Sequence, residues 1–127
     1  MEPILKHYGS PDADLRTFAP EGNFELLLEL EIGLSGDSKS DLFQVVISTP
    51  RCADDFELED LPALRKGYII VDQYDLNAVI DKLNHFISEC SGHTWLEIAR
   101  KLSSKFFWEY EHEDAARHSW FIAKKIV

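Results

Sequence analysis

Apolar and acidic residues alternate through residues 24–32 more regularly than anywhere else in the chain. Every second side chain from Phe24 onward is apolar, and Glu25, Glu29 and Glu31 lie at positions between them. A period of two is the period of a strand that buries one face and exposes the other. The pattern therefore predicts a strand whose outer face is acidic.

Three further segments have the composition of strands. Residues 3–8 form a short candidate that ends at a Gly-Ser-Pro sequence. Residues 42–48 are rich in Val and Ile, and a flexible hairpin loop at 33–40 connects them to the acidic strand. Residues 68–74 form a fourth candidate, which follows a glycine.

After residue 75 the apolar residues recur at helical spacing. Asp75 is an N-cap candidate for a first helix, and Gly92 is placed to end it. Thr94 and Glu97 have the spacing of a capping box, which predicts the start of a second helix. Strands followed by helices predict an α+β fold, in which an antiparallel sheet of about four to five strands carries two amphipathic helices on one face.

Three segments leave alternatives open. Residues 51–66 fit a loop or a helical turn, and residues 118–123 fit a last strand or a short helix. Residues 107–114 alternate between apolar and acidic side chains, which suits a strand or an extended segment.

The length of 127 residues predicts a single domain, residues 1–127. We expect it to comprise strands and loops at 1–74, two helices at 75–107, and a motif segment with a C-terminal extension at 108–127. Two cysteines with no paired spacing and an N-terminus without a signal-peptide pattern predict a cytoplasmic protein, and no apolar run is long enough to span a membrane.

The net charge of −10 resides entirely in the first part of the chain. Residues 1–75 contain 16 acidic and 6 basic side chains, whereas residues 76–127 contain 7 of each. A negative field of this strength repels nucleic acid and anionic membranes and speeds the encounter with a basic partner. We therefore expect neither nucleic acid nor a membrane as partner.

The acidic residues are densest at 54–60, where apolar residues are interleaved among them. Such a segment is most often a solvated loop, but Phe56 among carboxylates resembles an apolar binding hot spot with a polar rim. We expect partner contacts from this segment, from the acidic strand and from the C-terminal region: Asp54, Asp55, Phe56, Glu57, Glu59, Asp60, Glu25, Glu29, Glu31, Glu109 and Glu111.

Catalytic patterns are absent from the sequence. There is no nucleophile elbow or phosphate-binding loop, and the histidines and acids near the C-terminus match no standard zinc spacing. Glu109, Glu111 and His112 are the residues that a metal-dependent hydrolase would use, although a general acid there would need burial. We expect no catalytic residue, no metal and no cofactor. A generic acidic interaction subunit is a further alternative, and the sequence leaves the oligomeric state open.

The residues Trp108-Glu109-Tyr110, together with Ser48-Thr49-Pro50 and Ser91-Gly92-His93-Thr94-Trp95, resemble the immunity protein 8 family of bacterial polymorphic toxin systems. The family has a Trp-Glu-Phe motif, and Tyr110 replaces the third residue here. The resemblance covers residues 3–112. It implies a cytoplasmic protein that binds and neutralises a cognate toxin without catalysis, and it does not name the toxin.

Two expectations follow for how such a protein would work. The acidic surface would occlude a basic surface or active site of the toxin, and against a nuclease the carboxylates would stand where phosphates bind. Trp108 is expected to be structural, because a large ring after an amphipathic helix most often fills the edge of a core.

Overall fold

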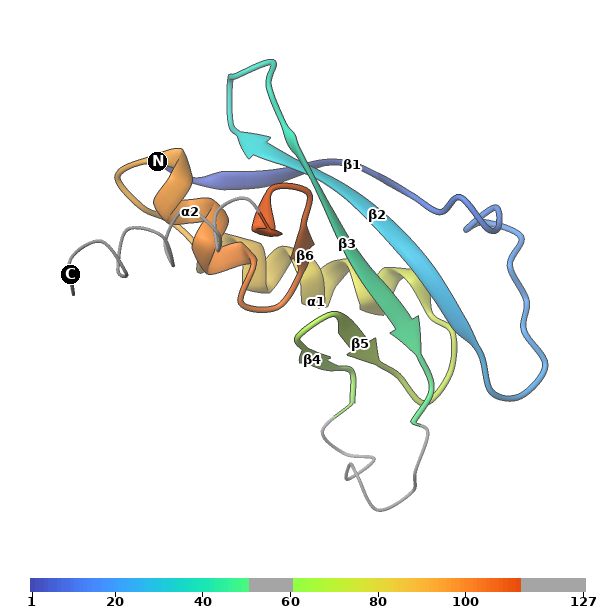
Figure 1. The fold of residues 1–127 in the computed structure, drawn as a ribbon. Helices are drawn as coiled ribbons and strands as arrows, with labels where there is room; N and C mark the ends of the chain where they lie inside the picture. Colours follow the sequence, from blue (N-terminus) through green and yellow to red (C-terminus); the bar gives the residue numbers. More distant parts are fainter. Residues whose placement is uncertain (51–60, 113–127) are drawn as a thin grey trace.

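The structure is a computed structural model that describes residues 1–50 and 61–112. The described residues form one sheet and two helices (Figure 1). Along the chain the elements are β1 (Pro3–Gly9), β2 (Glu25–Leu34), β3 (Asp41–Ser48), β4 (Ala63–Arg65), β5 (Tyr68–Ile70), α1 (Leu76–Ser88), α2 (Trp95–Leu102) and β6 (Phe107–Trp108). The strand order is β1-β2-β3-β5-β4, and β6 pairs with β3.

β2 has the predicted alternation. Leu26, Leu28, Leu30 and Ile32 are at most 3% exposed and point into the core, as do Phe43, Val45 and Ile47 on the paired strand β3. In Figure 1 α1 crosses behind β2 and β3 and α2 lies to the left of β6, and buried residues of both helices pack in one cluster with these core residues. The expected α+β architecture with helices on one face is therefore confirmed.

The prediction of an antiparallel sheet of four to five strands is wrong. The described residues form a six-stranded mixed sheet, in which β5 runs parallel to β3. The physical reason is β4, a three-residue strand that pairs antiparallel with β5 and reverses the chain once more than the sequence suggested. The strand predicted at 68–74 ends at residue 70.

The helix starts match the prediction closely. The Asp75 Oδ1 atom accepts a hydrogen bond from the Ala78 N–H group, and Thr94 Oγ1 accepts one from the Glu97 N–H group, both at 3.2 Å. The other half of the capping box is shifted by one residue, because the Glu97 carboxylate accepts from the N–H group of His93 instead of Thr94.

The first helix ends earlier than Gly92 implied. α1 ends at Ser88, and the N–H group of Gly92 donates to the carbonyl of Met1 at 3.2 Å, which ties the chain start to the loop between the helices. Of the open segments, residues 107–108 form β6 and residues 63–65 form β4, whereas 51–60 and 113–127 lie outside the described residues.

Candidate functional site

The carboxylates of β2 lie on the sheet face opposite the helices, which we call the outer face. Glu25 and Glu31 are exposed and Glu29 is half-buried. Strand pairing places His7 and Leu42 on either side of Glu31, and Gly9 and Gln44 on either side of Glu29. The structure thus brings together the three strand carboxylates that the sequence predicted to contact a partner.

A shallow groove of about 490 Å³ runs over part of this outer face. Its lining residues come from the end of β1, the following turn and the neighbouring strands: His7, Tyr8, Gly9, Ser10, Pro11, Glu29, Glu31 and Leu42. Within residues 1–50 and 61–112, no basic side chain lies within 4.0 Å of the carboxylate of Glu29 or Glu31. The two carboxylates in the lining of the groove therefore have no neutralising partner within the described residues.

Trp108 is buried in the core cluster, next to β3. It is 8% exposed, and its ring stacks on Phe43 with centroids 6.3 Å apart. Its indole Nε1–H donates to Asp41 Oδ2 at 3.0 Å, and the indole of Trp95 donates to the same oxygen at 2.8 Å. One carboxylate of β3 thus joins α2 and β6 to the sheet. Tyr110 is 45% exposed and meets Trp108 edge to face.

Glu109 and Glu111 take part in contacts that hold the β6 region in place. The Glu109 Oε1 atom accepts a hydrogen bond from the Leu42 N–H group at 2.9 Å, and the Glu109 N–H group donates to the Leu42 carbonyl at 3.0 Å. Glu111 forms an ion pair with Lys66, whose Nζ also donates to the carbonyls of Ser103 and Phe106. These carboxylates and His112 form no metal-binding group; among the described residues no three His, Cys, Asp or Glu side chains could hold an ion.

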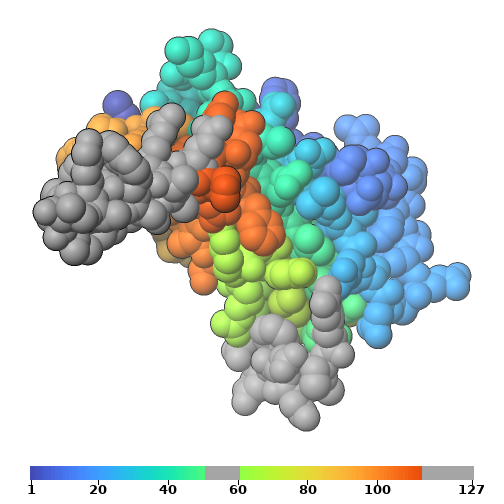
Figure 2. All heavy atoms as spheres, viewed as in Figure 1, coloured from blue at the N-terminus to red at the C-terminus, as the bar shows by residue number. Residues whose placement is uncertain are grey.

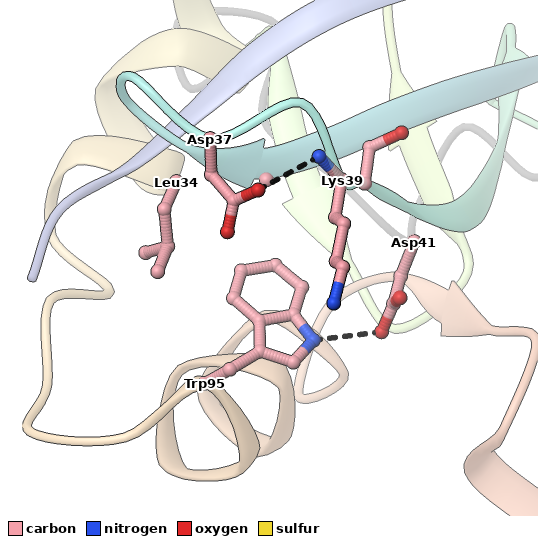
Figure 3. A pocket seen from close by; sticks show the side chains of 7 residues that line it. Leu34, Asp37, Lys39, Asp41 and Trp95 are labelled. Carbon is pink, nitrogen blue, oxygen red and sulfur yellow. Dashed lines mark hydrogen bonds between the residues drawn. The ribbon is translucent and has the colours of Figure 1, made fainter.

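A smaller pocket lies between the β2–β3 hairpin and the start of α2 (Figure 3). Its volume is about 190 Å³, and Leu34 and the Trp95 ring form its apolar wall, with Asp37, Lys39 and Asp41 around it. This volume is below the roughly 300–1,000 Å³ that is usual for small-molecule sites. The Trp95–Asp41 hydrogen bond explains the polar edge of the pocket without a ligand.

Cys90, two residues beyond the end of α1, is buried and its thiol is free. Burial, with a smaller contribution from the charge of Glu89, raises the pKa of its thiol to about 11. A thiol of that pKa is protonated at neutral pH and is a poor nucleophile. The acidic residues predicted at 54–60 lie outside the described residues.

Sequence reasoning missed two features of this region. Asp41 was not recognised as the shared acceptor of two indoles, because its partners are 54 and 67 residues away. Sequence reasoning also missed that the outer face carries apolar side chains, such as that of Val46 in β3. The sequence of β3 contains a signal for this, because Val45, Val46 and Ile47 are consecutive, which indicates apolar side chains on both faces of the strand.

A mixed sheet with helices on one side and the carboxylates of β2 on the other defines an α+β protein. Residues 4–113 match the sequence model of the family described as Immunity protein 8, and the chain belongs to that family. The family supports an immunity function against a toxin, and it confirms the resemblance carried by the Trp-Glu-Tyr segment. No curated protein and no solved structure gives a significant match. No helix in the described part of the chain is long and apolar enough to cross a bilayer.

Proposed function

We propose that the protein binds a cognate toxin in the bacterial cytoplasm and neutralises it by covering a basic surface or active site. The family match over residues 4–113 carries this proposal. Charge supports it further, because a chain of net charge −10 attracts a basic protein and repels the nucleic acid on which a nuclease toxin would act.

The contacts that we propose come from the acidic residues of the first 75 residues. The segment Asp54, Asp55, Phe56, Glu57, Glu59 and Asp60 and the strand carboxylates Glu25, Glu29 and Glu31 would dock on the toxin. Complementary fields raise association rates toward about 10⁸–10⁹ M⁻¹s⁻¹ at low salt, which suits protection against an enzyme that kills quickly. Glu109 and Glu111 are weaker candidates for contact, because each is engaged with the chain's own Leu42 or Lys66.

The first test is protection. The toxin encoded beside this chain's gene is expressed in a sensitive bacterial host with and without the chain, and survival is counted. We expect survival only when the chain is present, and survival that does not depend on it would overturn the proposal. An unrelated acidic protein of similar size serves as the control for charge alone.

The second test addresses the electrostatic part. Asp54, Asp55 and Glu57 are replaced together by lysine, and the association rate with the inactive toxin domain is measured against salt concentration. We expect a slower rate and a flatter salt dependence. An unchanged rate and slope would remove this acidic segment from the mechanism.

A further inference from the structure

The outer face of the sheet contains a row of apolar side chains between two carboxylates of β2. Strand pairing places Leu27 of β2 opposite Val46 of β3, and Val46 next to Tyr68 of β5, so the three side chains cross the sheet as one row. We call Leu27, Val46 and Tyr68 the apolar row. Along β2, Glu25 lies on one side of this row and Glu29 on the other.

These three side chains are only half-buried, whereas the core positions next to them in sequence are closed to solvent. Leu26, Leu28, Val45 and Ile47 are at most 3% exposed. Figure 2 shows atoms of β2, β3, β5 and β6 reaching the surface side by side on this face. A sheet with one solvated face normally carries polar side chains there, so an apolar row at that position indicates a surface that another molecule covers.

The next two rows continue this surface toward β1 and β6. One row contains Glu29, Gln44 and Phe107, and the other contains His7, Glu31 and Leu42. The side chain of Phe107 is 43% exposed. Glu29 and Glu31 also line the shallow groove described above. The outer face therefore combines an apolar centre with acidic residues at its margin, the usual composition of a protein-binding surface.

The charge of the face determines which occupant fits it. A basic protein surface would supply the cations that Glu29 and Glu31 lack among the described residues. A second copy of this chain would bring its own carboxylates and a further net charge of −10 against the same face. Arg65 of β4 lies beyond Tyr68, at the opposite end of the row from the carboxylates.

We infer that the outer face of the sheet is the docking surface for the basic surface of the cognate toxin. The apolar row forms the centre of the interface, and Glu29 and Glu31 receive lysine or arginine side chains at its margin. This inference rests on the proposed function and deepens it, because it locates the interface on the strands and separates two roles. The apolar row holds the complex together, and the carboxylates speed its formation.

The test measures the binding kinetics of purified variants with the inactive domain of the toxin encoded beside this chain's gene. E29K/E31K removes the carboxylates by charge reversal, and E29Q/E31Q removes their charge alone. L27T/V46T removes apolar contacts and keeps residues that suit a strand. Two controls carry matched changes at the helices: D81K/E89K, in α1 and at its C-cap, with the same change of net charge, and L96T at an exposed leucine of α2.

We expect E29K/E31K to slow association at least about tenfold and to flatten its salt dependence, with E29Q/E31Q intermediate. L27T/V46T is expected to speed dissociation at least about tenfold and to leave association nearly unchanged. Both controls should stay within about twofold of the wild type. Thermal unfolding verifies that each variant is folded, and the single variant V46T replaces the double one if that does not fold.

Two results would overturn the inference while the proposed function stands. In the first, the wild type binds the toxin and protects, and the outer-face variants have the same association and dissociation rates as the wild type. The interface would then lie elsewhere, for example at residues 54–60. In the second, the chain forms a homodimer, and L27T/V46T dissociates this homodimer but leaves toxin binding unchanged. A wild type that neither binds nor protects would instead reject the proposed function itself.

Discussion

At the scale of single residues, the described structure depends on a few side chains and turns that join segments distant in sequence. Lys66 and Gly67 in the turn between β4 and β5 are one such point. The Gly67 N–H group donates to the Lys105 carbonyl at 2.7 Å, and the Gly67 carbonyl accepts from the Val46 N–H group at 2.9 Å. The Lys66 Nζ atom lies 4.9 Å from the centroid of the Phe107 ring. This turn therefore fixes the position of β6 relative to the sheet.

Gly67→Ala is expected to destabilise the protein for two separate reasons. The φ angle of Gly67 is +83°, which costs an L-residue about 1–2 kcal/mol, and a Cβ atom there would lie 2.5 Å from Cε2 of Phe107. Displacing that exposed ring from its place beside Lys66 adds to this loss. Gly36→Ala is the matched control, since Gly36 has the same φ of +83° and a Cβ atom added there would have no neighbour within 4 Å. Urea unfolding should show a clearly larger loss for Gly67→Ala, and equal losses would contradict the contact with Phe107.

Asp41→Ala is expected to lower the free energy of unfolding by about 2–4 kcal/mol, because two partly buried indole N–H groups lose their acceptor. Asp41→Asn keeps a neutral acceptor oxygen, so its loss should be smaller. In a Trp95→Phe background one of the two donors is already gone, and Asp41→Ala should then cost less. Denaturant unfolding measures each value. A loss below about 0.5 kcal/mol, ordinary for a surface substitution, would show that the shared acceptor contributes little.

At the scale of elements, the sequence predicted those whose pattern repeats several times. β2 and both helices were recognised because each contains repeated apolar positions and, for the helices, a capping residue. β4 contains three residues, too few for a period, and the sequence suggested only a loop or a helical turn there. β6 contains two residues of the segment 107–114, for which a strand was one of the two alternatives. Because β4 sets the direction of β5, missing it also made the predicted sheet antiparallel.

The same argument applies to the candidate site. The alternation of β2 was enough to predict that Glu25, Glu29 and Glu31 share a face, because that follows from one strand alone. The apolar row needs the register between β2, β3 and β5, which only the folded structure provides. Local pattern therefore revealed the charge of the outer face but not its apolar centre.

Glu97 makes the start of α2 sensitive to pH. Its hydrogen bond from the His93 N–H group is the main cause that lowers the pKa of its carboxyl, with smaller contributions from the charges of Lys101 and His93 and an opposing effect of desolvation. A lowered pKa in the folded state means that the ionised carboxylate adds stability above its ordinary pKa of 4.5. This contribution is lost as the pH falls through the lower pKa of the folded state.

Glu97→Gln is therefore expected to lower the unfolding temperature at neutral pH and to have a shrinking effect as the pH falls below about 4.5. Thermal unfolding followed by circular dichroism across this pH range measures the difference between variant and wild type. Glu21→Gln, at an exposed carboxylate in the loop before β2, is the control for the loss of one charge. A difference between Glu97→Gln and wild type that stays constant with pH would contradict the role of the ionised form.

At the scale of the whole molecule, charge and architecture follow different divisions of the chain. The helices and β6 come from a part of the chain with balanced charge, whereas β1 to β5 come from the part that carries the net charge of −10. The helices cover one face of the sheet, so the carboxylates of β2 gather on the other. An asymmetric charge along the sequence thus becomes an acidic face of the fold, at the expense of repulsion among its own charges.

This repulsion predicts that moderate salt stabilises the protein. The screening length falls from about 30 Å at 0.01 M to about 8 Å at 0.15 M ionic strength, which weakens repulsion across the molecule but hardly affects contacts at hydrogen-bond distance. We expect the unfolding temperature to rise by a few degrees over this range, measured in sodium chloride by calorimetry. The variant with Asp54, Asp55 and Glu57 replaced by lysine has a formal net charge of −4 in place of −10, so its rise should be smaller. An equal rise of the unfolding temperature in both proteins would mean that the salt acts through something other than the acidic excess. A larger rise in the wild type would show that the charge that suits a basic partner weakens the fold when that partner is absent.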